Sequence, residues 1–175
     1  METILKVGEI QKEQAELIVL GLLEDQVVLG KAAAAMDQIL GGQISRIISD
    51  GDFKGKAKEL VLLYNAAGSA AKRILLVGLG KESKLNPESI RVAAGVSAKR
   101  VLDLGVKKFA MEVLGADQEK MNLADSVQAV VEGAGLALYE FTPLKSDTGD
   151  KKKMIEEITL VIPDNFDLKA AEAGM

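Results

Sequence analysis

The 175-residue sequence contains no histidine and no cysteine. Their absence excludes Ser-His-Asp and Cys-His nucleophile systems, zinc sites built on imidazole or thiolate, disulfide bonds and thiol redox chemistry. Carboxylates, lysines, tyrosines and hydroxyl groups are the side chains left for catalysis. No constellation of them assembles the acid, base and electrophile that an active site needs. We therefore expect no catalytic residue and no metal ligand in this chain.

Aromatic residues and long apolar runs are also scarce. Aromatics make up 3% of the residues, so the core must be built from Val, Leu, Ile and Ala. Apolar runs such as LIVL before Gly21 are far too short to cross a bilayer, and the start METILKVGEI has no signal-peptide pattern. A net charge of −4 and a pI near 5.1 argue against a dedicated nucleic-acid binder. We expect a cytoplasmic protein with no membrane partner.

Strand and helix patterns alternate along the chain. Apolar runs and alternation predict strands at Thr3–Val7, Glu16–Leu23, Glu59–Tyr64, Arg73–Val77, Lys107–Leu114 and Glu157–Ile162. Apolar residues at helical spacing, together with capping and terminating residues, predict five helices. They are Lys31–Leu40, Gln43–Ser49, Pro87 to Gly105 after an Asn86 cap, Asn122 or Asp125 to about Tyr139, and a helix from Asp167 onward. This order favours an α/β three-layer sandwich with a mostly parallel sheet of about six strands.

A glycine loop, the weak anion-loop candidate Gly78, Gly80 and Lys81, follows the apolar run RILLV. A dinucleotide fingerprint needs a third glycine where Ser83 stands, and the helix cap arrives only at Asn86. The Walker pattern fails as well, because Lys81 is followed by a glutamate in place of Ser or Thr. We favour the interpretation that glycine permits a tight exit from a buried strand.

Four other groups of charged residues could carry function. They are the run Lys151–Lys153, the pairs Glu24 with Asp25 and Asp50 with Asp52, and the lone Glu132. The lysines lie in an expected loop and are closely followed by glutamates, which indicates a solvated charge run. The acidic pairs lack the spacing of a calcium loop and are explained by caps and turns. The lone glutamate has no evident partner, so a surface position is expected.

Three stretches, taken in order, point to a known family. GDFKGKAKE (Gly51–Glu59), RILLVGLGK (Arg73–Lys81) and EGAGLALYEFTPLKSD (Glu132–Asp147) resemble the N-terminal domain of the leucyl (cytosol) aminopeptidases. The resemblance covers nearly the whole chain and implies a macro-domain-like fold for residues 1–165. Residues 166–175 would begin the helix that leads to a catalytic domain not included here.

The resemblance implies that catalysis belongs to a different domain of the parent protein. Enzymes of this family release N-terminal amino acids from peptides with two divalent metal ions, manganese or zinc, held in a separate C-terminal domain. The family's hallmark stretch NTDAEGR is absent, so no catalytic or metal residue can be assigned to a position here. The implied partners are the chain's own catalytic domain, a homo-hexamer and peptide substrates. Two alternatives stay open: a macro-like module that binds a nucleotide or ADP-ribose, and a DNA-binding accessory role of the parent.

Overall fold

In the part of the chain that the structure describes, six strands form one sheet. The computed structural model describes residues 1–24, 28–64, 70–118, 121–139 and 154–175. The strands are β1 (Glu2–Val7), β2 (Leu17–Leu23), β3 (Leu60–Tyr64), β4 (Arg73–Gly80), β5 (Lys108–Glu112) and β6 (Glu157–Ile162). They lie in the order β1-β6-β5-β2-β4-β3, and all neighbours pair in parallel except β3 with β4. The predicted α/β class and mostly parallel sheet are confirmed.

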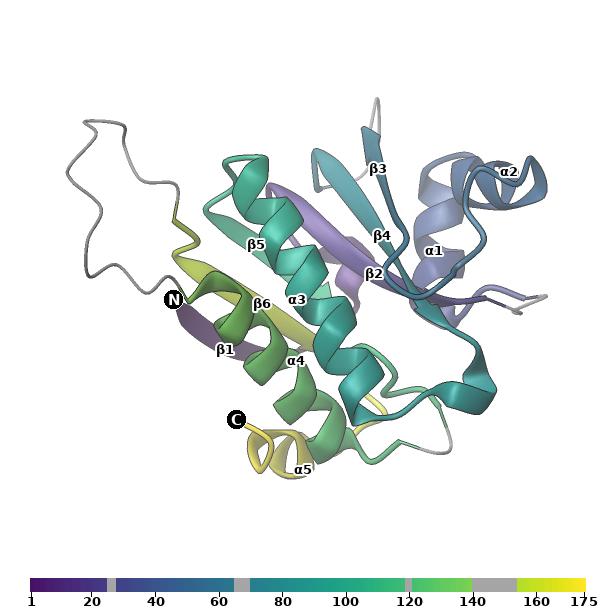
Figure 1. Ribbon diagram of the computed structural model, residues 1–175. Helices are drawn as coiled ribbons and strands as arrows, with labels where there is room; N and C mark the ends of the chain where they lie inside the picture. Colours follow the sequence, from purple (N-terminus) through teal and green to yellow (C-terminus); the bar gives the residue numbers. More distant parts are fainter. Residues whose placement is uncertain (25–27, 65–69, 119–120, 140–153) are drawn as a thin grey trace.

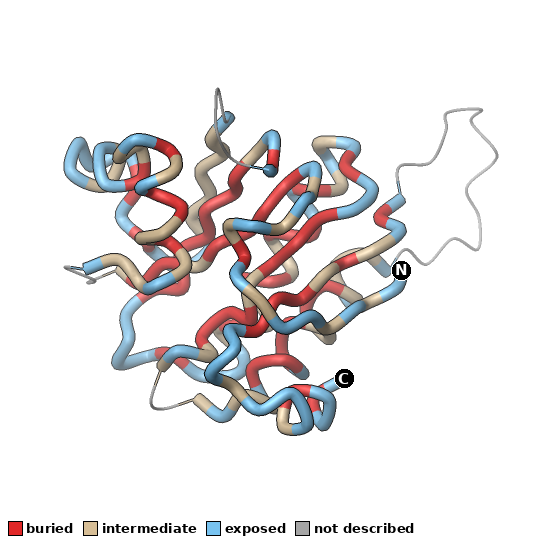
Figure 2. Tube along the Cα trace, turned by 180° about the vertical axis from the view of Figure 1, so that it is seen from behind, coloured by how far each residue is buried: buried red, intermediate tan, exposed pale blue. Residues whose placement is uncertain are grey.

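Helices cover both faces of this sheet (Figure 1). They are α1 (Lys31–Ile39), α2 (Gln43–Ser49), α3 (Pro87–Asp103), α4 (Leu123–Leu138), α5 (Leu168–Glu172) and the 3-10 turns η1 (Ile10–Lys12) and η2 (Glu82–Lys84). Alternate residues of β2 enter two separate cores: Leu17 and Val19 pack with α3 and α4, while Ile18 and Leu20 pack with α1 and α2. Both faces of β2 are therefore buried, as its apolar sequence predicts, and Figure 2 shows the buried residues concentrated along the strands.

Helices α3 and α4 begin at capping residues that the sequence predicts. Asn86 caps α3 in a reciprocal pair, since Asn86 Oδ1 accepts from the backbone N–H of Ser89 and Ser89 Oγ accepts from that of Asn86, both at 3.0 Å. Pro87 occupies the first helical position. Of the two starts left open for α4, Asn122 is the cap, and its Oδ1 accepts from the N–H of Ala124 at 2.8 Å.

Two predicted strands end two or more residues away from the predicted position, and three others begin one residue away from it. β4 continues past Val77 to Gly80 because its end pairs with β2, where Gly80 lies opposite Leu23. β5 is shorter than the predicted Lys107–Leu114 and ends at Glu112. Beyond Glu112 the N–H of Val113 still donates to the carbonyl of Val161 at 3.4 Å, and the chain then turns to form the rim of a cavity described below.

Glu132 has a partner that the sequence did not reveal. Its Oε2 accepts from Arg91 of α3, at 2.9 Å from Nε and 2.6 Å from Nη2, while Oε1 accepts from Gln128 at 2.8 Å. These bonds lower the pKa of the Glu132 carboxyl, first through Gln128 and then through Arg91. The side chain stays on the surface, as expected, and links α4 to α3.

A buried acid holds the start of α2. That helix follows Gly42, which provides no side-chain cap, and the carboxylate of Asp37 on α1 takes the place of one. Asp37 Oδ1 accepts from the N–H groups of Ile44 at 2.7 Å and Ser45 at 3.1 Å. The otherwise orphaned amides of the first turn are satisfied from the neighbouring helix.

We expect the change Asp37→Ala to lower the free energy of unfolding by about 1–3 kcal/mol, because the buried amide of Ile44 and the partly buried amide of Ser45 lose a charged acceptor. Urea unfolding at pH 7 measures the loss. The matched control is Asp52→Ala, an exposed acid in the turn after α2, which should change stability by less than about 0.5 kcal/mol. Equal effects of the two changes would contradict this role for Asp37.

Candidate functional site

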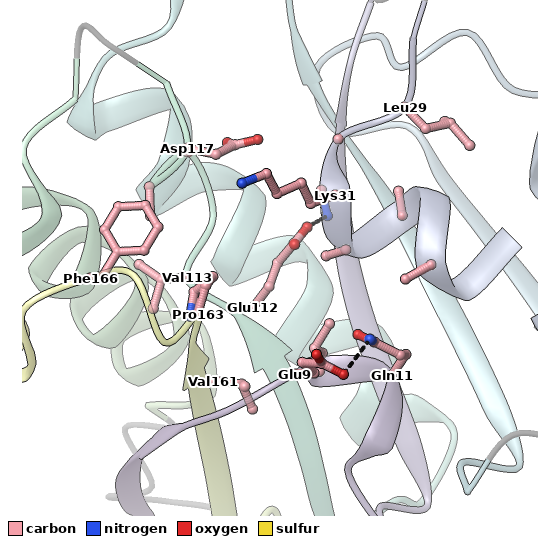
Figure 3. Close-up of a pocket in the computed structure, with 18 of the residues that line it drawn as sticks. Glu9, Gln11, Leu29, Lys31, Glu112, Val113, Asp117, Val161, Pro163 and Phe166 are labelled. Carbon is pink, nitrogen blue, oxygen red and sulfur yellow. Dashed lines mark hydrogen bonds between the residues drawn. The ribbon is translucent and has the colours of Figure 1, made fainter. Parts of the chain in front are cut away.

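A cavity of about 870 Å³ opens at the carboxyl ends of β2, β5 and β6. From β2 the chain proceeds through α1 and α2 to β3 and β4 on one side, whereas β5 and β6 lie on the other. The switch between β2 and β5 leaves a crevice at their ends, which is where open α/β sheets bind ligands. Its rim is formed by the start of α1 and by the segments that follow β1, β5 and β6 (Figure 3).

Glu112, the last residue of β5, bridges this crevice. The β2–β5 ladder pairs Ile18 with Ala110 and Val19 with Met111. At the next step along β2, the N–H of Gly21 donates to Oε1 of Glu112 at 2.6 Å, so a side chain replaces the backbone acceptor. Among the described residues, the second carboxylate oxygen has no hydrogen-bond partner. No pattern in the sequence around Glu112 indicates this role.

The environment of Glu112 favours its neutral form. Its carboxylate keeps some surface open to the cavity, but surrounding protein atoms withdraw it from water. This burial raises the pKa of Glu112 to about 8, the bond from Gly21 opposes the rise, and the nearby charge of Asp117 adds to it. A carboxyl group in a cleft with a strongly shifted pKa marks a candidate functional site.

The glycine loop, the weak anion-loop candidate of the sequence, lies beside the cavity and packs against the chain itself. The N–H of Gly78 donates to the carbonyl of Glu59 at 2.8 Å, and the N–H of Gly80 donates to that of Gly55 at 2.9 Å. A Cβ on Gly78 would stand 1.9 Å from the carbonyl oxygen of Lys56. The glycines allow residues 55–58 to approach β4, and their amides are already bonded. Lys81 is exposed beyond the strand end.

The other charged groups are dispersed. Asp50 and Asp52 are exposed in the turn after α2, and Glu24 follows β2. Asp25 and the run Lys151–Lys153 lie outside the described residues. Within the ranges that the structure describes, no three or more acidic side chains are arranged to hold a metal ion. No helix in those ranges is long and apolar enough to span a membrane.

The architecture defines a macro-domain-like protein. A Trypanosoma brucei macrodomain, solved in complex with ADP, superposes with a TM-score of 0.73 at 13% identity, covering 99% of this chain and 67% of that one. A mutant of tomato leucine aminopeptidase gives a TM-score of 0.78 at 20% identity, covering 99% of this chain and 34% of that one. At such identities these likenesses establish the fold.

Sequence comparison establishes the family. The model of the cytosol aminopeptidase family, N-terminal domain, matches residues 19–148. The "Probable cytosol aminopeptidase" of Nitrosospira multiformis is 35% identical over 162 residues, which is 93% of this chain and 31% of that protein. The chain belongs to the cytosol aminopeptidase family and corresponds to its N-terminal domain. It spans about a third of the length of this relative.

Proposed function

We propose that this chain is the non-catalytic assembly and regulatory domain of a longer cytosol aminopeptidase. The observation that carries the proposal is the family match, which runs along residues 19–148 to the N-terminal domain. Two features of the chain agree with it: the sequence lacks histidine and cysteine, and the described residues present no metal-holding cluster. The chemistry is accordingly assigned to polypeptide beyond this domain.

In this proposal the parent protein releases N-terminal amino acids from peptides by two-metal hydrolysis in the cytoplasm. The catalytic domain holds two divalent metal ions, manganese or zinc, which supply a water nucleophile and stabilise the charge that develops on the peptide carbonyl. The present domain binds that catalytic domain and takes part in a homo-hexamer. Its residues bind neither metal nor peptide bond, and residues 166–175, which include α5, lead from residues 1–165 toward the catalytic domain.

A second candidate is the binding of a nucleotide or ADP-ribose in the cavity. Two observations favour it: the cavity lies at the topological switch point, and the fold is shared with a macrodomain solved in complex with ADP. The charge of the lining argues against this candidate, because Glu9, Asp117 and Asp164 would repel a diphosphate. Calorimetry with ADP-ribose and with ATP tests the candidate. Micromolar affinity would favour it over the assembly role alone.

A DNA-binding accessory role of the parent has less support. The domain has a net charge of −4, whereas binding to phosphate backbones needs a concentrated basic surface. Such a role would require DNA affinity that falls steeply with salt. Gel-shift titrations at two salt concentrations measure that dependence, and we expect no shift from this chain at either.

The proposed function predicts that the longer protein has aminopeptidase activity and that the 175-residue chain does not. The 175-residue chain, incubated with leucine p-nitroanilide and Mn²⁺, should release no more p-nitroaniline than metal alone. The protein translated from the longer gene should hydrolyse the same substrate. The control is the longer protein stripped of metal by a chelator, which should lose activity. Metal-dependent hydrolysis by the 175-residue chain would overturn the proposal.

A further inference from the structure

The cavity at the switch point has an acidic lining. Four carboxylates reach it from four different segments: Glu9 after β1, Glu112 at the end of β5, Asp117 beyond it, and Asp164 after β6. The cationic side chain among the described lining residues is Lys31 at the start of α1. With all carboxylates ionised the lining carries an excess of negative charge. Such a cleft attracts cations and repels anions.

One acceptor in this lining is left open. Oε1 of Glu112 is occupied by the N–H of Gly21, and the other oxygen has no partner among the described residues. Figure 3 shows Lys31 extending toward the space between Glu112 and Asp117. No ion pair within 4.0 Å joins Lys31 to either acid in the described structure. A partly desolvated carboxylate oxygen that faces a cavity favours a charged or polar donor from a ligand.

The rest of the cavity wall is largely apolar. The apolar side chains come from β2, β4, the segments around α1 and the strand ends, and include Leu23, Leu29, Leu79, Val113, Pro163 and Phe166. Phe166 lies on the same side as Val113 and Pro163, across the cavity from Leu29 (Figure 3). A ligand that fills this space gains from burying an apolar body against those walls.

We propose that the cavity binds a small organic cation, a primary ammonium group carried on an apolar body, with the open oxygen of Glu112 as its acceptor. The ammonium donates to Glu112, and the acids at the rim add attraction. Lys31 and the positive end of α1 near Gly30 oppose it, so Lys31 must move aside. A bare metal ion fits poorly, because the described acids do not gather as a ligand set.

Cation binding should depend on pH through Glu112. Its pKa of about 8 means that near pH 7 the group is mostly protonated and must lose its proton to accept an ammonium. The other charged groups that face the cavity are Glu9, Asp117, Asp164 and Lys31, and the charge of Asp117 contributes to the raised pKa of Glu112. Affinity should therefore be about tenfold higher at pH 9 than at pH 7, in proportion to the ionised fraction.

The probe that tests the site is 4-phenylbutylamine, titrated into the 175-residue chain by calorimetry at pH 7 and pH 9. The neutral 4-phenylbutan-1-ol and the anionic 4-phenylbutyrate have the same apolar body and serve as ligand controls. We expect the amine to bind at least about tenfold more tightly than either. Binding at pH 7 should also release close to one proton, seen as a dependence of the measured heat on the ionisation heat of the buffer.

Two variants test which side chains determine the affinity for the amine. Glu112→Gln keeps an oxygen that can accept from Gly21 and should weaken amine binding about tenfold or more while abolishing its pH dependence. Lys31→Met removes the competing cation and should tighten binding about threefold. Thermal melts verify that both variants fold.

Equal affinity of the amine for the wild-type protein and Glu112→Gln would overturn the proposal. So would equal affinity for the amine and the alcohol, or no binding of the amine at pH 9. The site does not rest on the aminopeptidase assignment. Loss of amine binding with the leucine p-nitroanilide result unchanged would refute the cavity proposal alone.

Discussion

Replacing Gly133 by alanine should destabilise the protein by about 3 kcal/mol or more. A Cβ at this position of α4 would stand 2.1 Å from the carbonyl oxygen and 2.8 Å from the carbonyl carbon of Arg91 on α3. Both atoms are backbone, so a side-chain rotation cannot relieve the overlap, and α3 and α4 would have to separate. Overpacking of this kind costs about 1–3 kcal/mol and more where the backbone must move.

The control lies two residues along the same helix. A Cβ on Gly135 would meet nothing within 4 Å, so Gly135→Ala should stabilise α4 by about 0.5–1 kcal/mol through helix propensity. Guanidinium unfolding of both variants and of the wild-type protein gives the comparison. Similar stability of Gly133→Ala and Gly135→Ala would show that α3 and α4 are not in such close contact.

The second large effect concerns the pH dependence of stability. Glu112 has a pKa of about 8 in the folded protein, against about 4.3 in an unfolded chain. Below the unfolded value the group is protonated in both states and does not affect stability. As the pH rises to about 8, the unfolded chain ionises first and the folded state loses stability, and above pH 8 the penalty is constant.

Glu112→Gln should remove this penalty. The variant's free energy of unfolding should exceed that of the wild-type protein by an amount that is small at pH 4 and rises to the order of 4–5 kcal/mol at pH 9. Urea unfolding at pH 4, 6, 7.5 and 9 measures it. A difference between the two proteins that does not change with pH would contradict the raised pKa.

Glu132→Gln provides a control of opposite sign. The pKa of Glu132 is lowered by Gln128 and Arg91, so its contribution to stability is present above the unfolded pKa and is lost as the pH falls through the folded pKa. This variant should therefore be less stable than the wild-type protein at neutral pH, and the difference should shrink in acid. The two glutamates carry the same carboxyl group and differ in what surrounds it, since burial raises the pKa of one and hydrogen bonds lower the pKa of the other.

Local patterns predict most of the fold. Apolar runs that suit burial on both faces predict strands β2 and β4. The N-cap Asn86 and the following Pro87 predict the start of α3. These features depend on a few neighbouring residues, which is why they can be read from one sequence. The apolar run alone predicts an end of β4 at Val77, whereas the strand continues to Gly80 because Gly80 pairs with Leu23, on a strand far away in the chain.

The cavity could not be predicted in the same way. Its central bond joins Gly21 to Glu112, which are 91 positions apart, and it depends on the strand order that places β5 beside β2. A single glutamate at the end of an alternating strand gives no sign of this in the sequence. The loop of Gly78 and Gly80 is the opposite case. Its glycines form a conspicuous pattern in the sequence, and the structure explains them by the close approach of residues 55–58 to β4.

The central claim is that the metal ions are held by the catalytic domain and not by this one. Measuring metal binding by the 175-residue chain tests it most directly. The chain is equilibrated with Mn²⁺ or Zn²⁺, passed through a desalting column, and its metal content is determined by mass spectrometry. The absence of histidine and cysteine predicts that it retains much less than one ion per molecule. Two tightly held ions per molecule would contradict a non-catalytic domain.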